Sequence, residues 1–273
     1  MFTYIDPSVR ERLISQGKLR RIDGEGTEIE VAEPGAPVGR ALELLGPIPL
    51  PMNLTGREIQ AQWYAFVRRT EIDRVSELAA QLRAEGGQHL FASLSSPLAV
   101  NSLLVFGDAD RARKPLVRVH SNCLTGDIFG SRRCECGPQL AAAVDQIDAE
   151  PEGGYLVYMA GHEGRGIGLW AKAATYLLQD AGENTYQANR SLGLPEDSRD
   201  FSDAATILKW ALRGRSLRLL TNNPKKQQDL EAAGIEGIEM VKHVVGVSTH
   251  NRAYLAAKRS WGHRLEEDDI ERR

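Results

Sequence analysis

Apolar residues recur along most of this chain with the spacing of alternating strands and helices. Short apolar runs beyond residue 88 predict strands. The predicted strands lie near 90–95, 100–106, 115–120, 154–159 and 216–220. Helical spacing predicts helices near 136–149, 166–181, 202–213 and 225–233. This alternation, with no internal repeat, predicts a mixed α/β domain whose sheet is at least partly covered by helices.

The N-terminal region shows a different pattern. Residues 1–53 are rich in Gly, Pro and charged residues, with little sustained periodicity, so we expect an irregular extension. Between Thr55 and Glu85 the apolar residues suit one or two amphipathic helices that end at Gly86-Gly87. These helices would pack on the main domain or on a second subunit.

Composition narrows the class of partner. The chain has 273 residues and a formal net charge of −3, and its Lys and Arg residues are spread along it. This argues against a nucleic-acid scaffold and for a local anion site that takes a small molecule. No segment resembles a signal peptide or has the apolar length of a membrane span, so we expect a cytoplasmic protein that does not bind membranes.

Three cysteines form the first chemical motif. The segment HSNCLTGDIFGSRRCECG places Cys123, Cys134 and Cys136 within fourteen residues, and its glycines let the loop fold back. Three thiolates leave the fourth tetrahedral zinc position open to water, which is the pattern of a catalytic site. Incidental buried cysteines, or a structural site completed by a histidine such as His120, are alternative interpretations. A redox pair is disfavoured because one residue separates the closer cysteines.

Two strand ends carry groups that suit a phosphate. Arg118 closes a predicted strand just before the cysteine loop, where its guanidinium could clamp an anion. The Gly-rich turn AGHEGRGIGL also follows a strand and surrounds Glu163 and Arg165 with glycines, so its backbone N–H groups could cradle an anion. A tight strand-to-helix corner is the plainer interpretation of the same turn.

Two further loops supply candidates. In LLTNNPKK, Thr221 and Lys226 follow a strand, although a capped helix with solvated lysines explains the segment equally well. In GLPEDSRDF, Asp197 and Arg199 lie in a polar loop where a carboxylate could move protons, and Asp200 could cap the following helix.

Several of these motifs together resemble the GTP cyclohydrolase II family. RVHSNCLTGDIFGSRRCECGPQL, EGRGIGL, TYLLQDAG, TYQAN, LGLPEDSRDF and LLTNNPKK match that family in the same order, over about residues 88–264. The resemblance divides the chain into an N-terminal extension (1–87), an α/β catalytic domain (88–264) and a charged C-terminal tail (265–273). It also implies a homodimer.

The resemblance assigns roles to individual positions. It implies that Cys123, Cys134 and Cys136 bind a catalytic Zn²⁺, that Asp197 is the general base, that Arg199 attacks the α-phosphate and that Tyr176 assists at the reacting ring. A triphosphate substrate would bring Mg²⁺. The implied nucleotide-binding positions are Arg118, Val119, His120, Ser121, Asn122, Gln139, Glu163, Gly164, Arg165, Thr185, Thr221 and Lys226.

Departures from the family pattern bear on the substrate. The family usually has Arg-Gln before Glu163, where this chain has Gly161 and His162, and it usually has Glu in place of Asn122 and Gln187. A carboxylate suits the two N–H donors of guanine, whereas the amide of Gln187 suits uracil, if that side chain faces the base. The string MAGHEGRGIGLWAKA is most similar to a branch of the family that opens uracil nucleotides.

The leading hypothesis is therefore a zinc-dependent nucleotide cyclohydrolase acting on UTP or UMP in pyrimidine catabolism. In this hypothesis His162 and Tyr176 position the ring and Gln187 binds the base. The alternative is GTP cyclohydrolase II, which forms the diaminopyrimidine precursor of riboflavin and releases formate and pyrophosphate. A non-catalytic nucleotide-binding homologue is a second alternative.

Overall fold

A single mixed sheet organises the computed structural model, which describes residues 5–31, 41–54, 56–68 and 100–271. Within these residues the sheet has nine strands in the order β2-β1-β3-β4-β5-β7-β6-β8-β9. Strands β7, β6, β8 and β9 run parallel, and the other neighbouring strands pair antiparallel. The strands are β1 (Leu19–Asp23), β2 (Glu28–Ile29), β3 (Ala41–Met52), β4 (Ile59–Arg68), β5 (Asn101–Phe106), β6 (Leu116–Ser121), β7 (Gly154–Met159), β8 (Leu217–Leu220) and β9 (Ile238–Val241).

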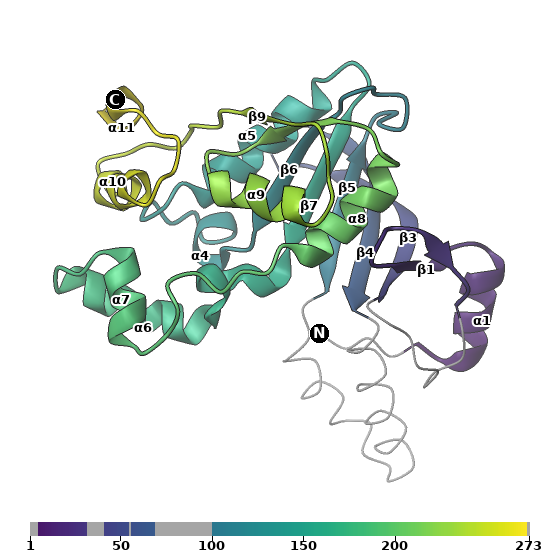
Figure 1. The fold of residues 1–273 in the computed structure, drawn as a ribbon, viewed down its shortest axis with the longest axis horizontal. Helices are drawn as coiled ribbons and strands as arrows, with labels where there is room; N and C mark the ends of the chain where they lie inside the picture. Colours follow the sequence, from purple (N-terminus) through teal and green to yellow (C-terminus); the bar gives the residue numbers. More distant parts are fainter. Residues whose placement is uncertain (1–4, 32–40, 55, 69–99, 272–273) are drawn as a thin grey trace, which may run out of the picture.

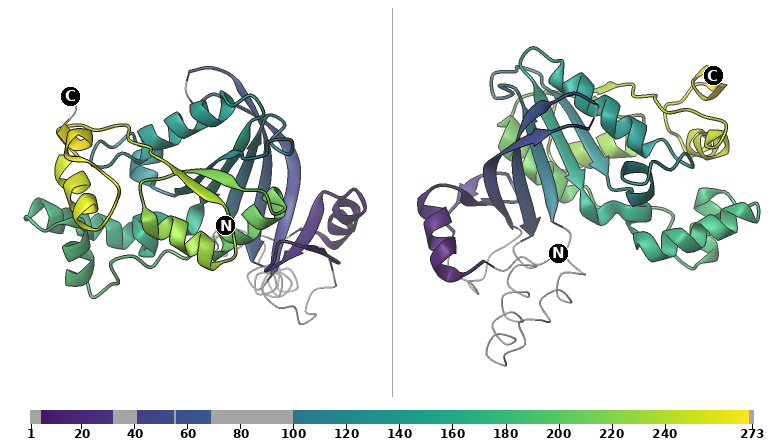
Figure 2. Two further views of the ribbon diagram at one scale, coloured as in Figure 1. Left: turned by 45° about the horizontal axis from the view of Figure 1, so that its top comes forward. Right: turned by 180° about the vertical axis from the view of Figure 1, so that it is seen from behind.

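Helices cover both faces of the parallel half of the sheet. In Figures 1 and 2, α8 and α9 lie on one face and α5 on the other, while α6, α7, α10 and α11 extend beyond the sheet on one side. The helical segments are α1 (Pro7–Ser15), α4 (Leu124–Asp127), α5 (Cys136–Asp148), the 3₁₀ segment η2 (Ala160–Gly166), α6 (Gly168–Asp180), α7 (Thr185–Ser191), α8 (Ser202–Leu212), α9 (Pro224–Ala232), α10 (Arg252–Ser260) and α11 (Glu267–Glu271).

Two apolar cores lie on opposite faces of the sheet. Alternate side chains of a strand point to opposite faces. Val117 and Val119 of β6 accordingly pack with α8 in one core, and Leu116 packs with Val144 and Ile147 of α5 in the other. Burial of each large apolar side chain contributes about 1.5–3 kcal/mol, so these cores hold the parallel strands in place.

The predicted α/β domain is confirmed. Strands β5, β6, β7 and β8 coincide with predicted strands, and helices α5, α6, α8 and α9 coincide with predicted helices. The strand predicted near 90–95 lies outside the described residues. Helix α7, strand β9 and the C-terminal helices are short and were not predicted.

The prediction for the N-terminal region was wrong where the structure describes it. Residues expected to be irregular form α1, β1, β2 and β3, and the region expected to begin an amphipathic helix forms β4 between β3 and β5. Ile59 and Ala61 of β4 face one core and Phe66 faces the other. Apolar residues on both faces hide the two-residue period of a strand and imitate helical spacing. Residues 69–85 of the predicted helices lie outside the described part of the chain.

Prolines also concealed β3. Pro47, Pro49 and Pro51 stand in its second half, and a proline cannot donate a backbone hydrogen bond. Strand β1 pairs only with the first half of β3, from Ala41 to Leu45. Among the described residues, the second half has β4 as its only neighbour, so it tolerates residues that lack an N–H on the other edge.

The sheet continues across the predicted boundary between extension and catalytic domain. Strand β4 pairs edge to edge with β5, the first described strand after that boundary, and so joins β1, β2 and β3 to the rest of the sheet. The predicted C-terminal tail includes Leu265 and Ile270, which are buried against Leu255 of α10. The domain division itself remains a prediction. None of the described helices combines the length and apolar character required to span a membrane.

Replacing Phe66 tests the position of β4 in the sheet. Phe66 is fully buried, so we expect Phe66→Ala to lower the free energy of unfolding by about 3–5 kcal/mol. Gln62→Ala, on an exposed position of the same strand, should change it by less than about 0.5 kcal/mol. Urea denaturation followed by circular dichroism measures both, and equal effects would contradict the placement of β4.

Candidate active site

The candidate site lies where the parallel strands end. Loops that follow the carboxyl ends of β6, β7 and β8 meet α6 and α10 around one cleft. In sheets of this kind, side chains following neighbouring parallel strands converge, and ligands bind there. The loop after β6 supplies Cys123, and the segment after β7 supplies Glu163 and Arg165. The loop after β8 supplies Thr221, and the first turn of α9 supplies Lys226.

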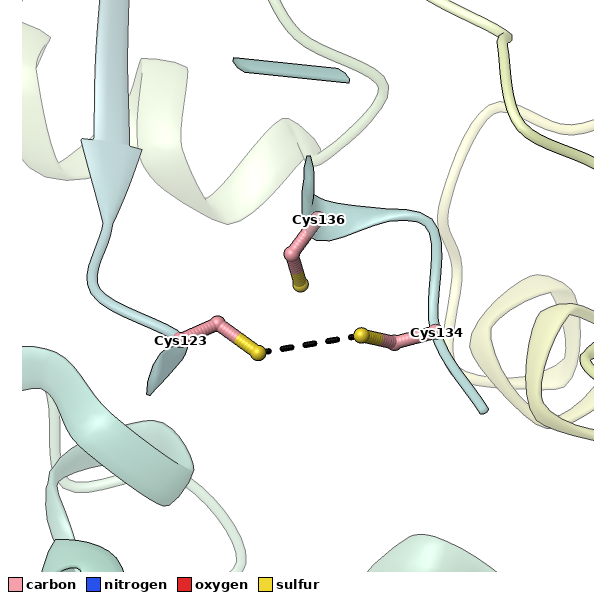
Figure 3. A group of neighbouring side chains, drawn as sticks. All are labelled: Cys123, Cys134 and Cys136. Carbon is pink, nitrogen blue, oxygen red and sulfur yellow. Dashed lines mark hydrogen bonds between the residues drawn. The ribbon is translucent and has the colours of Figure 1, made fainter. Parts of the chain in front are cut away.

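The three cysteines converge at one end of this cleft. Cys123 precedes α4, and Cys134 and Cys136 lie at the start of α5, so two elements bring the sulfurs together (Figure 3). All three Sγ atoms lie within 4.8 Å of one another, and those of Cys123 and Cys134 are 3.7 Å apart. All three thiols are free of disulfides.

Tetrahedral zinc fits this cluster. A Zn–S bond of about 2.3 Å and tetrahedral angles place two sulfur ligands about 3.8 Å apart. The measured Cys123–Cys134 separation agrees with that value. Gly126 leaves room for the cluster, since a Cβ atom there would lie 3.0 Å from Cys134 Sγ and 3.1 Å from Cys123 Sγ. The donor set and the space around it therefore suit a compact ion with three protein ligands.

Lys172 of α6 joins the cysteine cluster to the loop after β7. Its Nζ donates to Cys123 Sγ at 3.1 Å and to Glu163 Oε1 at 2.6 Å. The other oxygen of Glu163 accepts the backbone N–H of Leu124 at 2.7 Å. Both charged side chains are nearly buried, and this arrangement fixes Cys123 and the start of α4.

Lys172 was not among the site residues predicted from the sequence. Its position four residues before Tyr176 on a predicted helix was the available signal, because residues four apart share a helix face. Tyr176 also lines the cleft, donates to or accepts from Thr125 Oγ1 at 3.0 Å, and packs under the guanidinium of Arg133. Burial raises the pKa of Tyr176, so its hydroxyl keeps its proton near neutral pH.

Buried cations form a second part of the cleft. Arg118 donates to the carbonyl of Leu220 and to Gln139 Oε1, both at 2.8 Å, and Lys226 Nζ donates to the carbonyl of Val119 at 2.6 Å. Burial lowers the pKa of Arg118 to about 10. Burial, and then the charges of Arg118 and Arg199, lower the pKa of Lys226 well below its ordinary value. An anion in the cleft would offset the free-energy cost of burying these positive charges.

Arg165 adds a positive charge on a strained backbone. Its φ of 64° lies in the left-handed region between Gly164 and Gly166, which is costly for a residue with a side chain. The guanidinium lies 3.8 Å from the centroid of the Tyr186 ring. Nη1 is buried and has no hydrogen-bond partner among the described residues, so it is available to a ligand in the cleft.

Asp197 and Arg199 form a two-bond ion pair at the cleft. Arg199 Nε donates to Oδ1 at 2.9 Å and Nη2 donates to Oδ2 at 2.5 Å, while Nη1 reaches Ser121 Oγ at 3.4 Å. Burial alone would raise the pKa of Asp197, but the hydrogen bonds and charge of Arg199 outweigh it and lower that pKa. Asp197 is therefore an ionised carboxylate at neutral pH. Arg199 lines the cleft directly and Asp197 stands behind it.

His162 is held by two hydrogen bonds. Its Nε2 lies 3.0 Å from the carbonyl of Asp200, which can only accept, so Nε2 carries the proton. Nδ1 then accepts from Ser121 Oγ at 3.2 Å. Burial lowers the pKa of His162 to about 4, so the ring is neutral near pH 7. This geometry fits a residue that orients Ser121.

The structure gathers most of the predicted site residues in one place. Besides the residues above, the cleft is lined by His120, Ser121, Asn122, Gln139, Gly164, Thr185 and Thr221. His120 bonds Asp127 through Nε2, at 3.1 Å to each carboxylate oxygen. Asn122 bonds the carbonyl of Ala160 and the hydroxyl of Tyr158.

Three predicted residues do not line the cleft. Asp197 lies behind Arg199, which donates two hydrogen bonds to its carboxylate. The side chain of Val119 is buried in an apolar core. Gln187 is exposed, and its Oε1 accepts the backbone N–H of Asn184 at 2.9 Å, which caps the start of α7. The cleft also includes Tyr254, Lys258 and His263, which the sequence analysis did not select. More than a hundred residues separate these from the cysteine motif, so no local pattern linked them to it.

The fold and the site thus define an α/β protein in which a three-thiol cluster suited to a metal ion lies beside a cleft lined with buried cations. Residues 81–242 match the family model described as GTP cyclohydrolase II. The chain belongs to the GTP cyclohydrolase II family, as its motifs predicted.

Curated relatives agree with this assignment. The chain is 46% identical over 215 residues to the riboflavin biosynthesis protein RibBA of Salinispora arenicola, which covers 77% of this chain and 50% of that protein. It is 45% identical over 200 residues to the protein of the same name from Mycobacterium tuberculosis, covering 73% of this chain and 46% of the relative. The chain spans about half the length of these relatives.

Replacing Gly126 tests the metal cluster without removing a ligand. A methyl group at Gly126 would press against two sulfurs, so we expect Gly126→Ala to weaken zinc binding by about tenfold or more. Gly130→Ala is the control, because a Cβ there meets nothing within 4 Å. Its positive φ should cost about 1 kcal/mol of stability without affecting the metal. Competition with a chelating dye measures zinc affinity, and equal affinities in both variants would contradict the assignment.

Proposed function

We propose that this chain is a zinc-dependent cyclohydrolase that opens the imidazole ring of GTP. The observation that carries the proposal is the meeting of the three-cysteine cluster with buried, unpaired cations in one cleft. The family assignment and relatives named as riboflavin biosynthesis proteins support it.

Guanine is favoured over uracil because of the position of Gln187. The uracil hypothesis required this amide to face the base, whereas here it caps the start of its own helix and is exposed to solvent. The preference for uracil that was expected from Gln187 therefore has no support in the structure. The substrate named by the family description therefore becomes the proposed one.

The phosphates would be held by the cations on β6 and at the start of α9. Arg118 and Lys226 are buried and form no ion pair within the described residues, so a phosphate would supply the charge they lack. Arg165 offers its buried Nη1 from the opposite loop. We propose that the triphosphate binds Mg²⁺ and that the active form is a homodimer.

The cysteine cluster would supply the hydrolytic chemistry. Cys123, Cys134 and Cys136 would hold zinc, which acts as a Lewis acid and lowers the pKa of water bound to it. Lys172 and Glu163 fix Cys123 for this purpose. The protonated hydroxyl of Tyr176 on α6 lies beside Thr125 of α4, two residues after Cys123. From there it can donate a hydrogen bond to the reacting ring.

Proton transfer would fall to Asp197. Its carboxylate is ionised at neutral pH and is held by Arg199, so it can accept a proton in the reaction. An attack of Arg199 on the α-phosphate would require loss of a guanidinium proton. Asp197 accepts hydrogen bonds from Nε and Nη2, so it is the group placed to take that proton.

The test is to incubate zinc-loaded protein separately with GTP, UTP and UMP and to identify products by mass spectrometry. We expect formate release and a diaminopyrimidine product from GTP alone. Loss of uracil absorbance with a ring-opened product would instead support the uracil hypothesis. Binding of GTP without turnover would indicate the non-catalytic homologue.

Lys226→Met separates substrate binding from stability. Burial disfavours the charged lysine in the folded state, and this cost acts at pH values below the unfolded pKa, which includes neutral pH. Removing the amine should therefore leave the melting temperature unchanged or higher. The KM for GTP should rise about 10-fold to 100-fold through loss of a charge-assisted hydrogen bond. A fall in melting temperature with unchanged KM would contradict the assignment.

Asp197→Asn tests proton transfer. The amide keeps the size of the side chain but cannot accept the proton, so we expect kcat to fall about 10²-fold to 10⁴-fold. Zinc content should be unchanged, because Asp197 is outside the cysteine cluster. Asp229→Asn, which alters an exposed ion pair on α9, is the matched control and should retain full activity. Normal turnover by Asp197→Asn would exclude it as the base.

A further inference from the structure

The C-terminal segment beyond the matched family region forms part of the cleft. The match ends at residue 242, yet Tyr254, Lys258, His263 and Leu265 line the cleft that contains the cysteines. Figures 1 and 2 show this segment, with α10 and α11, on the side of the sheet where α6 and α7 also extend. The N–H of Arg264 donates to the carbonyl of Asn222 at 2.8 Å, which ties the segment to the loop after β8.

His263 is placed among the phosphate-binding cations by this tie. Its backbone N–H closes the end of α10 by donating to the carbonyl of Lys258 at 3.1 Å, and its ring enters the cleft wall. Ring atom Nδ1 is buried and has no hydrogen-bond partner among the described residues. A buried polar nitrogen without a partner is costly, so it indicates a group that a ligand completes.

The charges around His263 identify the kind of ligand. The charges that act most strongly on its ring are those of Lys258, Arg165, Arg199 and Lys226, and these four are positive. Lys258 pairs with Glu135 and Arg199 with Asp197, which leaves Arg165 and Lys226 without an ion pair in the described residues. An excess of positive charge around a free nitrogen suits a ligand with several negative charges.

We propose that His263 is a substrate-binding residue whose ring nitrogen Nδ1 donates a hydrogen bond to the phosphate chain of the nucleotide. The inference deepens the proposed function and, for the identity of the nucleotide, rests on it. His263 would close the phosphate site from the C-terminal side, opposite Arg118 and Lys226.

A neutral histidine is suited to this position. Burial, and then the charges of Lys258 and Arg165, lower the pKa of His263 to about 3, so the ring is uncharged near neutral pH. A neutral ring still has one N–H donor. It can therefore bind phosphate without adding another positive charge to a site already rich in them.

Substitutions that move the donor test this inference in the full chain. The amide nitrogen of Asn occupies nearly the position of Nδ1, whereas that of Gln corresponds to Nε2. We expect His263→Gln and His263→Leu to weaken the binding of inorganic pyrophosphate by about 10-fold to 100-fold, and His263→Asn to retain affinity within about threefold. The control is His250→Ala, which changes an exposed histidine outside the cleft and should not alter binding.

Isothermal titration calorimetry with pyrophosphate measures binding without requiring turnover. Loss in the Gln variant with retention in the Asn variant would support the inference, and it would do so even if GTP proved not to be the substrate. Equal affinity in wild type, Gln and Leu variants would overturn it, as would a wild-type protein that does not bind pyrophosphate. Melting temperatures distinguish a binding defect from unfolding. If the Leu variant does not fold, the comparison between the Asn and Gln variants decides the test.

Discussion

The walls of the cleft bury more positive charge than the neighbouring carboxylates neutralise. Arg118 lies on β6, and Lys226 lies in the first turn of α9, which follows the neighbouring parallel strand β8. Both side chains are almost fully buried and donate hydrogen bonds to backbone or amide oxygens. Burial of an uncompensated cation is costly, as the lowered pKa of each side chain reflects. The two apolar cores hold these strands in place and so keep the cations buried. An anion bound between the cations would offset the cost of their burial.

The metal cluster and the cation cluster are connected through shared elements. Strand β6 carries Arg118 and leads directly to Cys123, and helix α5 carries Cys136 and also Gln139, which accepts from Arg118. A substrate held by its phosphates on one cluster would therefore have its other end directed towards the other. Lys172 and Glu163 add a link from α6 to the sulfur of Cys123, so the closing wall of the cleft also fixes a metal ligand.

Substrate choice depends on the direction of a few side chains. Gln187 differs from the family pattern, and its amide group by itself favoured uracil. In the folded chain its amide is used to cap α7, together with Asn184, so the difference changes a helix start and not the wall of the cleft. His162, another departure, is occupied on both ring nitrogens and supports Ser121. Each departure has a local structural use that the sequence pattern does not reveal.

The sequence by itself determined strands β5 to β8, helices α5, α6, α8 and α9, and the proximity of the three cysteines. Those strands are short and apolar, the helices are amphipathic, and the three cysteines are close in the chain, so local pattern is sufficient. Tertiary structure decided the rest. Strand β4 has apolar residues on both faces and β3 contains three prolines, so neither shows a strand period, and pairing between distant segments makes them strands. Lys258 and His263 join the cleft because the segment after α10 hydrogen-bonds to the loop after β8, a contact between residues far apart in the chain. The direction of Gln187 likewise follows from hydrogen bonds at the start of α7, because a side chain binds the nearest unpaired donor that geometry allows.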